Sequence, residues 1–326
     1  MTSQKLQVCE CIALPGRIDL KTVYRLLPND PDKAYYRERV DRNIGWIRED
    51  EQELLKNSVV GIAGCGGMGG QLAQIFLRLG VGEIRIADCE FFDASNINRQ
   101  FAAGRKTVGV SKALATARML RDITDDTTLV VYPQGIVEET VEDFVRGCDV
   151  ICDEIEFWAI GARILLHQTA REHNVPLFVC STVGFGTRLM FFKPDGYTME
   201  SCVNLTLEEA FSLQRKVQTR SASDEEMLYA LGKLVGKLVP EVHGYTSTGS
   251  EYDDLAYSIE RARKTGEASI ISTNPSMASG FLADRVLLYL LKDSGITRDT
   301  TELPEPPGYL YVDAAKMLAK TVLGER

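Results

Sequence analysis

The chain has 326 residues, of which 44% are hydrophobic and 25% are charged, and its formal net charge is −9 at pH 7. This length and composition are typical of a globular protein with one or two domains and a sizeable core. The acidic balance, without any Lys/Arg-rich block, disfavours nucleic acid as a main partner. No apolar run reaches the length of about 18 residues that a transmembrane helix needs, and the N-terminal stretch lacks a signal-peptide pattern, so we expect no membrane partner.

The chain contains 8 cysteines, none of them in a C-x-x-C pair. Three of them, Cys148, Cys152 and Cys180, stand in apolar, strand-like runs, where a thiol usually behaves as a small buried hydrophobe. We therefore expect free thiols, a reducing cytoplasm as the compartment, and no structural zinc.

The first half of the chain alternates predicted strands with predicted helices. After a short helix over 49–57, the apolar pattern predicts strands over 58–64, 83–88, 128–134 and 148–153. Helical spacing predicts helices over 68–80, 110–123, 141–147 and 157–174. Strands that alternate with helices pair in parallel, so we expect a doubly wound, mostly parallel α/β sheet of the Rossmann type.

The second half changes character. Residues 176–194 predict two antiparallel strands joined at "GFG", and 205–265 predict a mostly helical insert. An amphipathic helix over 275–295 and a last strand over 308–314 follow.

We divide the chain into three parts on this basis. An N-terminal extension covers 1–38, a nucleotide-binding core covers 39–175, and a continuation of the same sheet, with the insert, covers 176–326.

The stretch "GIAGCGGMGG" runs from a predicted strand into a glycine cluster formed by Gly64, Gly66, Gly67 and Gly69. Glycine allows a tight turn and lets the backbone approach a phosphate closely, while the N–H groups at the start of the next helix attract anions. The motif alone is weak, because a tight strand–helix turn needs no ligand.

Asp88 closes the second predicted strand, where an acid accepts hydrogen bonds from ribose hydroxyls in nucleotide-binding folds. This pairing predicts a nucleotide but does not choose between NAD and ATP. Four residues that follow Asp88 in the sequence favour ATP: Asn96, Arg99, Gln100 and Lys112. Their cationic and amide groups suit a triphosphate, whereas a nicotinamide enzyme has no use for them. The alternative is that Arg99 and Lys112 are solvated surface charges.

Several motifs together resemble one known family. They are "RVDRNIG" (39–45), "EQELLKNSVVGIAGCGGMGG" (51–70), "LGVGEIRIADCE" (79–90), "SNINRQ" (95–100), "VGVSKALATAR" (108–118) and "CDVICDEIE" (148–156). In this order and spacing they resemble the ThiF/MoeB/HesA family, the adenylyltransferases related to ubiquitin-activating enzymes. The resemblance is strongest over 42–186.

The resemblance implies a doubly wound homodimer that uses ATP and Mg²⁺ to adenylate a carboxylate. It implies that Gly67 approaches the phosphates, that Asp88 holds the ribose, and that Arg42 enters the partner protomer's site. By the same resemblance, the catalytic residues are Arg42, Arg99, Lys112 and Glu156, with Glu156 as the metal ligand. The nucleotide-binding set is Gly64, Gly66, Gly67, Gly69, Asp88, Glu90, Asn96, Arg99, Gln100 and Lys112.

Three departures from the family pattern bear on function. Glu156 stands where the family usually has aspartate, and Asp153 or Glu154 are candidates to share its metal. The two C-x-x-C zinc pairs of many members are absent, and no cysteine follows Cys202. For Cys180 and Cys202, a buried thiol is favoured over a thioester nucleophile.

We therefore expect ATP-dependent adenylation of a carboxylate on a peptide or small protein, in peptide modification or natural-product biosynthesis. One alternative is activation of a ubiquitin-like or sulfur-carrier protein, and another is an inactive nucleotide-binding subunit. A nicotinamide dehydrogenase is disfavoured. His243, beside a polar loop, is a surface histidine or a base.

Overall fold

The structure is a computed structural model of the chain. It describes residues 19–28, 33–219, 221–223, 269–296 and 301–324, together with isolated positions between 225 and 265. His243 and two of the 8 cysteines, Cys9 and Cys11, lie outside the described residues.

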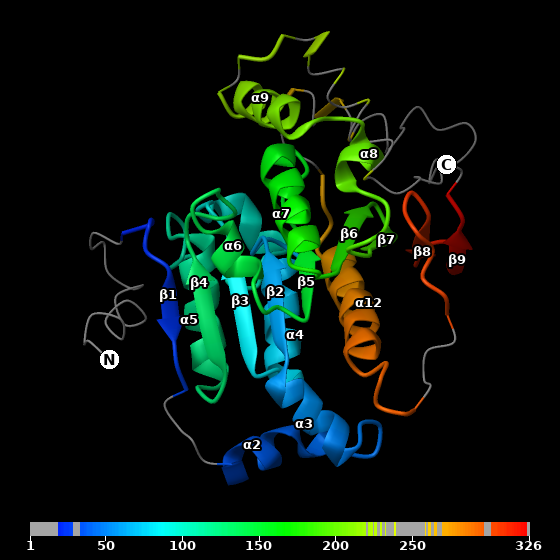
Figure 1. Cartoon of the computed structure of the whole chain (residues 1–326). Coiled ribbons are helices and arrows are strands. Elements are labelled where there is room, and N and C mark those ends of the chain that lie inside the picture. The colour runs from blue at the N-terminus through cyan, green and yellow to red at the C-terminus, as the bar shows by residue number, and fades with distance from the viewer. Residues whose placement is uncertain are drawn as a thin grey trace.

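A single sheet runs through the described chain in the order β1-β4-β3-β2-β5-β6-β7-β8-β9 (Figure 1). Its parallel centre consists of β2 (Val59–Ala63), β3 (Glu83–Ala87), β4 (Thr128–Tyr132), β5 (Val150–Asp153) and β6 (Leu177–Val183). The antiparallel members are β7 (Gly186–Phe192), β8 (Tyr309–Asp313) and β9 (Leu318–Val322) on one side and β1 (Tyr24–Leu26) on the other. The predicted doubly wound sheet with an antiparallel extension is confirmed.

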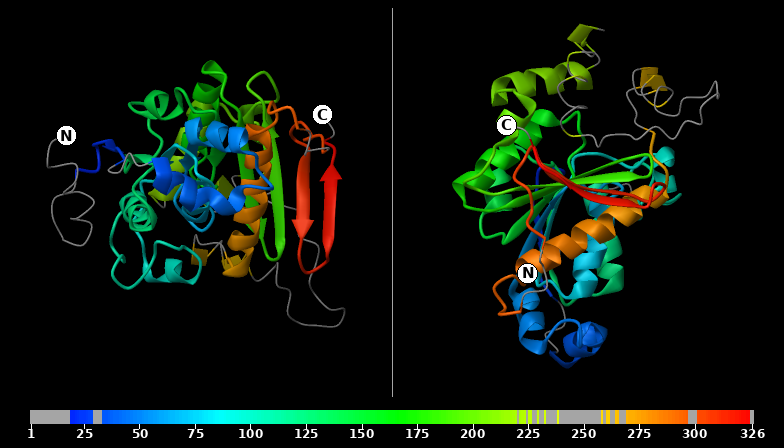
Figure 2. Two further views of the ribbon diagram at one scale, coloured as in Figure 1. Left: turned by 90° about the horizontal axis from the view of Figure 1, so that it is seen from below. Right: turned by 90° about the vertical axis from the view of Figure 1, so that its right-hand side faces the viewer.

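Helices cover both faces of this sheet. One face carries α4 (Gly69–Leu79), α5 (Lys112–Ile123) and α12 (Thr273–Leu290), which share one apolar cluster with the strands. The other face carries α6 (Val141–Val145), α7 (Ile160–Glu172) and α8 (Met199–Val203), with α9 (Leu207–Gln218) packed on α7. The right-hand view of Figure 2 shows α7 and α12 on opposite sides of the sheet. Two-sided coverage explains why the parallel strands are almost continuously apolar.

The remaining helices lie at the end of the sheet where β2 begins (Figure 1). They are α2 (Lys33–Val40), η1 (Asp41–Asn43) and α3 (Glu49–Asn57). A further short helix, η2 (Ala94–Asn98), lies in the loop after β3. No helix in the described part of the chain is long and apolar enough to cross a membrane.

Some expected boundaries were wrong. The strand predicted over 308–314 is not the last, because β9 follows it and pairs antiparallel with β8. The β9 sequence, "LAKTV", does not alternate apolar and polar residues, although the strand alternates half-buried and exposed positions, so this short edge strand does not stand out in the sequence. The helix predicted from 157 begins at Ile160, because residues 156–159 form a turn in which the Ala159 N–H donates to the Glu156 carbonyl.

Candidate functional site

The order of the parallel strands reverses between β2 and β5, so a crevice is expected beyond their carboxyl ends. The glycine loop follows β2 and residues 154–156 follow β5, which places both segments at this switch point. The backbones touch there, because the Glu154 N–H donates to the Ala63 carbonyl oxygen at 2.8 Å. The candidate site is therefore built where open α/β sheets commonly bind ligands.

Two glycines of the loop are required by the fold. Gly64 has a φ of +105°, and a Cβ there would lie 2.2 Å from the carbonyl oxygen of Glu154. A Cβ on Gly69 would lie 1.8 Å from the carbonyl oxygen of Gly64. Any side chain at either position would push β2, α4 and the 154–156 turn apart.

The other two glycines could hold a Cβ without a clash. A Cβ on Gly66 would have no neighbour closer than the Gln100 Nε2 at 3.9 Å, and one on Gly67 would meet Pro275 at an ordinary 3.4 Å. Neither residue has a positive φ. Within the described residues, the N–H groups of Gly66, Gly67 and Met68 donate no hydrogen bond. This open cradle of backbone donors at the start of α4 fits phosphate oxygens.

Asp88 lies directly beside the loop and is buried. Its Oδ2 accepts the Cys65 N–H at 2.7 Å, and its Oδ1 accepts the Glu90 N–H at 2.8 Å. Burial raises the pKa of Asp88 to about 6, although the nearby Lys112 ammonium opposes the rise. Each carboxylate oxygen keeps a lone pair that can accept a ribose hydroxyl.

We predict that the affinity for ATP falls as the pH drops below about 6, the pKa of Asp88. Protonation removes the ionised acceptor, so the dissociation constant should rise by up to roughly tenfold per pH unit below that value. Calorimetric titration of ATP between pH 5 and 8 measures this change. Because Asp88→Asn lacks the titrating group, subtracting its profile removes the nucleotide's own titration, and identical profiles for both proteins would contradict the prediction.

Lys112 begins α5 and points into the same site. Its side chain is only 7% exposed, and its Nζ lies 2.6 Å from Oε2 of the exposed Glu90. Burial alone would lower the pKa of Lys112, but the carboxylates of Asp88 and Glu90 outweigh it and raise the pKa. Lys112 is therefore a fixed, buried cation next to the residue expected to hold the ribose.

Residues after η2 form another wall of the site. Arg99 Cγ lies 3.6 Å from the position of a Cβ on Gly67, while its guanidinium donates to Asn98 Oδ1 at 2.9 Å. Gln100 is buried against Gly66, and its Oε1 has no hydrogen-bond partner among the described residues. A buried amide without a partner is costly, so its position suits a ligand group. Asn96 is buried too, but its Oδ1 accepts the Asp93 N–H at 3.2 Å and closes η2.

The α12 helix closes the remaining side. Pro275 packs on Gly67, and the Ser279 hydroxyl donates to the Met68 carbonyl oxygen at 3.3 Å. The buried Asn274 amide donates to the carbonyl oxygens of Gly184 at 2.7 Å and Gly186 at 3.1 Å, tying α12 to the β6–β7 turn. This wall could not be predicted, because nothing in the local sequence of 274–279 indicates contact with a loop about 200 residues earlier.

Glu156 occupies the expected place beyond β5, exposed at the rim of the site. Neighbouring protein atoms crowd its carboxylate and, with the charge of Glu90, raise its pKa, while Arg163 and Lys112 oppose the rise. Within the described residues, no three His, Cys, Asp or Glu side chains gather closely enough to hold a metal by themselves. Mg²⁺ usually takes one or two protein carboxylates plus nucleotide phosphates, and Glu156 fits that role.

Asp153 and Glu154 are poor candidates to share a metal. Asp153 is fully buried, and its Oδ2 lies 2.8 Å from Arg163 Nε and 3.0 Å from His167 Nε2. Burial alone would raise the pKa of Asp153, but these two partners lower it. Burial and the Asp153 charge raise the pKa of Glu154 well above its usual range, which disfavours the ionised form that a metal ligand needs.

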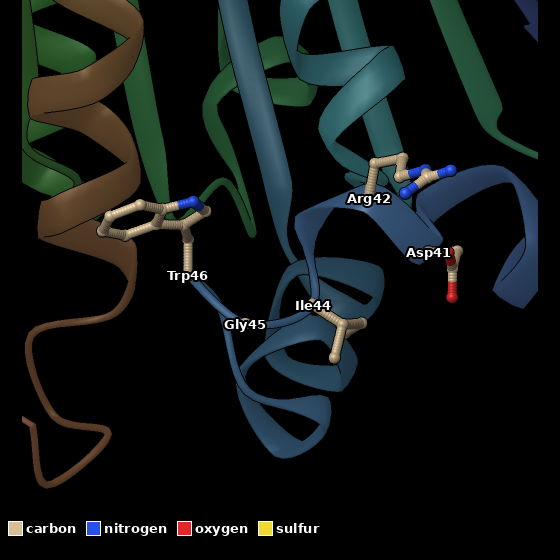
Figure 3. A pocket seen from close by; sticks show the side chains of 5 residues that line it. All are labelled: Asp41, Arg42, Ile44, Gly45 and Trp46. Carbon is tan, nitrogen blue, oxygen red and sulfur yellow. The ribbon is translucent and has the colours of Figure 1, made fainter.

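Arg42 lies far from this site within its own chain. It lines an open pocket with Asp41, Ile44, Gly45 and Trp46 (Figure 3). Its neighbour Asn43 donates to the Leu79 carbonyl oxygen at 3.2 Å, at the C-terminal end of α4, whereas the glycine loop is at the N-terminal end. The 11-residue α4 separates them by about 16 Å at 1.5 Å per residue, so Arg42 cannot reach its own glycine loop.

The candidate thioester cysteines are buried: Cys180 and Cys202 are 6% and 2% exposed. Burial raises the pKa of the Cys180 thiol well above its usual range, so it is a poor nucleophile. His167 is buried against Asp153, whereas His173 caps the C-terminal end of α7.

The fold and the site together define a Rossmann-like α/β protein with a buried lysine and a buried acid beside a glycine loop at the switch point of the sheet. The ThiF family matches residues 40–322, and the chain belongs to this family.

Curated relatives align with about half of the chain. The mouse (Mus musculus) adenylyltransferase and sulfurtransferase MOCS3 is 32% identical over 152 residues, which is 47% of this chain and 33% of the mouse protein. The sulfur carrier protein ThiS adenylyltransferase of Escherichia coli is 30% identical over 148 residues, which is 45% of this chain and 58% of that protein. The chain thus spans between a third and about three fifths of these relatives' own length.

Two solved structures share the fold over nearly the whole chain. PaaA superposes with a TM-score of 0.60 at 17% identity, covering 90% of this chain and 84% of PaaA. Escherichia coli MccB, solved with MccA-N7isoASN, gives a TM-score of 0.59 at 17% identity, covering 92% of this chain and 75% of MccB. At this level of identity the likeness shows the fold.

Proposed function

We propose that the protein uses ATP to adenylate a carboxylate, forming an acyl-adenylate and pyrophosphate. One observation carries this proposal: an open cradle of backbone N–H groups, a ribose-type acid and a buried lysine meet at the switch point of the sheet. Family membership supports the same chemistry, because the mouse and E. coli relatives are named adenylyltransferases.

The geometry suits a reaction that needs positioning and charge more than a protein nucleophile. A substrate carboxylate oxygen attacks the α-phosphorus of ATP, and the bond from the α-phosphorus to the bridging oxygen of the β-phosphate breaks. Lys112, Arg99 and the free N–H groups of the glycine loop stabilise the negative charge that shifts onto the leaving pyrophosphate. When bound at Glu156, Mg²⁺ would add charge neutralisation at the phosphates.

The proposed substrate is the carboxylate of a peptide or a small protein, in a peptide-modifying or natural-product pathway of the cytoplasm. The MccB neighbour solved with MccA supports this class. The ThiS adenylyltransferase relative favours the second candidate, activation of a sulfur-carrier or ubiquitin-like protein. The buried state of Cys180 and Cys202 favours an acceptor other than an enzyme thiol, and thus the first candidate.

ATP–pyrophosphate exchange tests the proposal. Labelled pyrophosphate should enter ATP only when a productive carboxylate is present, so a panel of peptides with free C-termini and of small carrier proteins identifies the class. ATP binding without exchange across the whole panel would support the inactive-subunit alternative. Binding of NAD in place of ATP would instead point to the dehydrogenase alternative.

The position of Arg42 supports a homodimer in which each protomer completes the other's site. Arg42 stands on the 41–46 turn, where Trp46 is 86% exposed, and lies beyond reach of its own glycine loop. We predict that Arg42→Ala and Lys112→Ala proteins, each inactive alone, recover exchange when mixed. Random re-pairing leaves one intact site in each hybrid dimer, so about a quarter of the wild-type rate is expected from site counting. No recovery after verified subunit exchange would show that Arg42 does not act in trans.

A further inference from the structure

A buried ionic cluster lies directly beneath the loop that carries Glu156. The Asp153 carboxylate meets the Arg163 Nε at 2.8 Å and the His167 Nε2 at 3.0 Å, and all three side chains are at least nine-tenths buried. Burial lowers the pKa of His167, so the ring is neutral near pH 7 and donates one N–H to Asp153. A buried ion pair adds little net stability, because removing two charges from water costs about as much as their attraction returns.

Arg163 holds the 153–156 turn at two points. Besides the Asp153 carboxylate, its guanidinium donates to the carbonyl oxygen of Ile155, the residue before Glu156. The Asp153 Oδ1 accepts the Ile155 N–H at 3.1 Å, so the peptide units on both sides of Ile155 are fixed. The turn then enters α7 through the hydrogen bond from Ala159 N–H to the Glu156 carbonyl at 2.9 Å.

We propose that Arg163 is a positioning residue that sets where the Glu156 carboxylate meets a divalent cation on the nucleotide. This inference rests on the proposed function. Glutamate has one more rotatable bond than aspartate, so its carboxylate sweeps a wider volume unless the backbone beneath it is fixed. Groups that orient a metal ligand commonly change metal affinity about 10- to 100-fold when they are removed.

The substitution Arg163→Lys tests this role, because lysine keeps the charge but lacks the fork that spans Asp153 and Ile155. The readouts are the affinity for the ATP analogue AMPCPP in EDTA, by calorimetry, and the affinity for Mn²⁺ in the presence of AMPCPP, by electron paramagnetic resonance. We expect the metal-free affinity to stay within about twofold and the Mn²⁺ affinity to fall at least about tenfold.

Arg171→Lys is the matched control, because Arg171 lies on the same helix but pairs with Glu200 at 2.6 Å, away from the glycine loop. It should leave both affinities unchanged. His167→Gln provides a milder variant should Arg163→Lys not fold, and it should reduce Mn²⁺ affinity in the same direction by a smaller factor. Its amide can still donate to Asp153, but from a different position.

Unchanged Mn²⁺ affinity in the folded variants would overturn the inference. So would a parallel loss of both affinities, since a merely structural role loosens the whole site. If the unsubstituted protein fails to bind AMPCPP at all, the proposed function falls and this inference falls with it. If the unsubstituted protein binds AMPCPP but the Arg163 variant shows no selective loss of Mn²⁺ affinity, the proposed function stands and only the positioning role of Arg163 falls.

Discussion

Replacing Lys112 with alanine is expected to weaken ATP binding about 100-fold while the protein stays folded. A hydrogen bond between two charged groups contributes roughly 1.5–3 kcal/mol, and Lys112 faces the place expected for the phosphates. A second effect acts in the same direction. The Lys112 ammonium opposes the rise in the Asp88 pKa, so its removal should protonate Asp88 more readily and weaken the ribose contact.

Calorimetric titration of ATP measures this change, with circular dichroism as the check on folding. Lys106→Ala is the matched control, because Lys106 is an exposed lysine of the same loop region and should leave the affinity unchanged. Equal losses in both variants would indicate a general effect of net charge. Unchanged affinity in the Lys112 variant would show that Lys112 does not contact the phosphates of ATP.

The alternation of apolar segments was sufficient to predict the parallel centre of the sheet. The strands β2 to β6 are buried on both faces, so their sequences are short apolar runs, and the helices between them show helical spacing. The edge strands β1 and β9 are different. Each is short and partly exposed, and its pairing partner is set by tertiary contacts that no local pattern reports.

Only those residues of the candidate site that stand at the ends of consecutive strands and helices could be predicted from the sequence. Gly64, Asp88 and Lys112 come at the ends and beginnings of consecutive elements, so the fold alone brings them together. Arg163 was missed although it lies in a predicted helix. Its role depends on reaching back across the turn to Asp153, and a single arginine on a helix is usually a solvated charge. The position of Arg42 likewise depends on how α3 packs against the end of α4.

The glycines allow a sharp separation of folding from binding. Gly67→Ala should keep the fold, because its new methyl group meets Pro275 at an ordinary contact distance. The same methyl group would lie against Pro275 and Arg99 at the wall of the cradle, and we expect it to narrow the approach to the free N–H groups. We expect the dissociation constant for ATP to rise at least about thirtyfold, which corresponds to roughly 2 kcal/mol of lost charge-assisted hydrogen bonding.

Gly69→Ala should impair folding itself, before ATP binding can be tested. Its Cβ would lie 1.8 Å from the Gly64 carbonyl oxygen, and a backbone atom at the end of a buried strand cannot move aside. We expect a loss of more than about 4 kcal/mol in the free energy of unfolding, measured by urea denaturation. Gly104→Ala is the control, since a Cβ there meets no atom within 4 Å. If Gly67→Ala unfolds the protein as Gly69→Ala does, the loop is a packing turn. If it folds and binds ATP normally, the phosphates lie elsewhere.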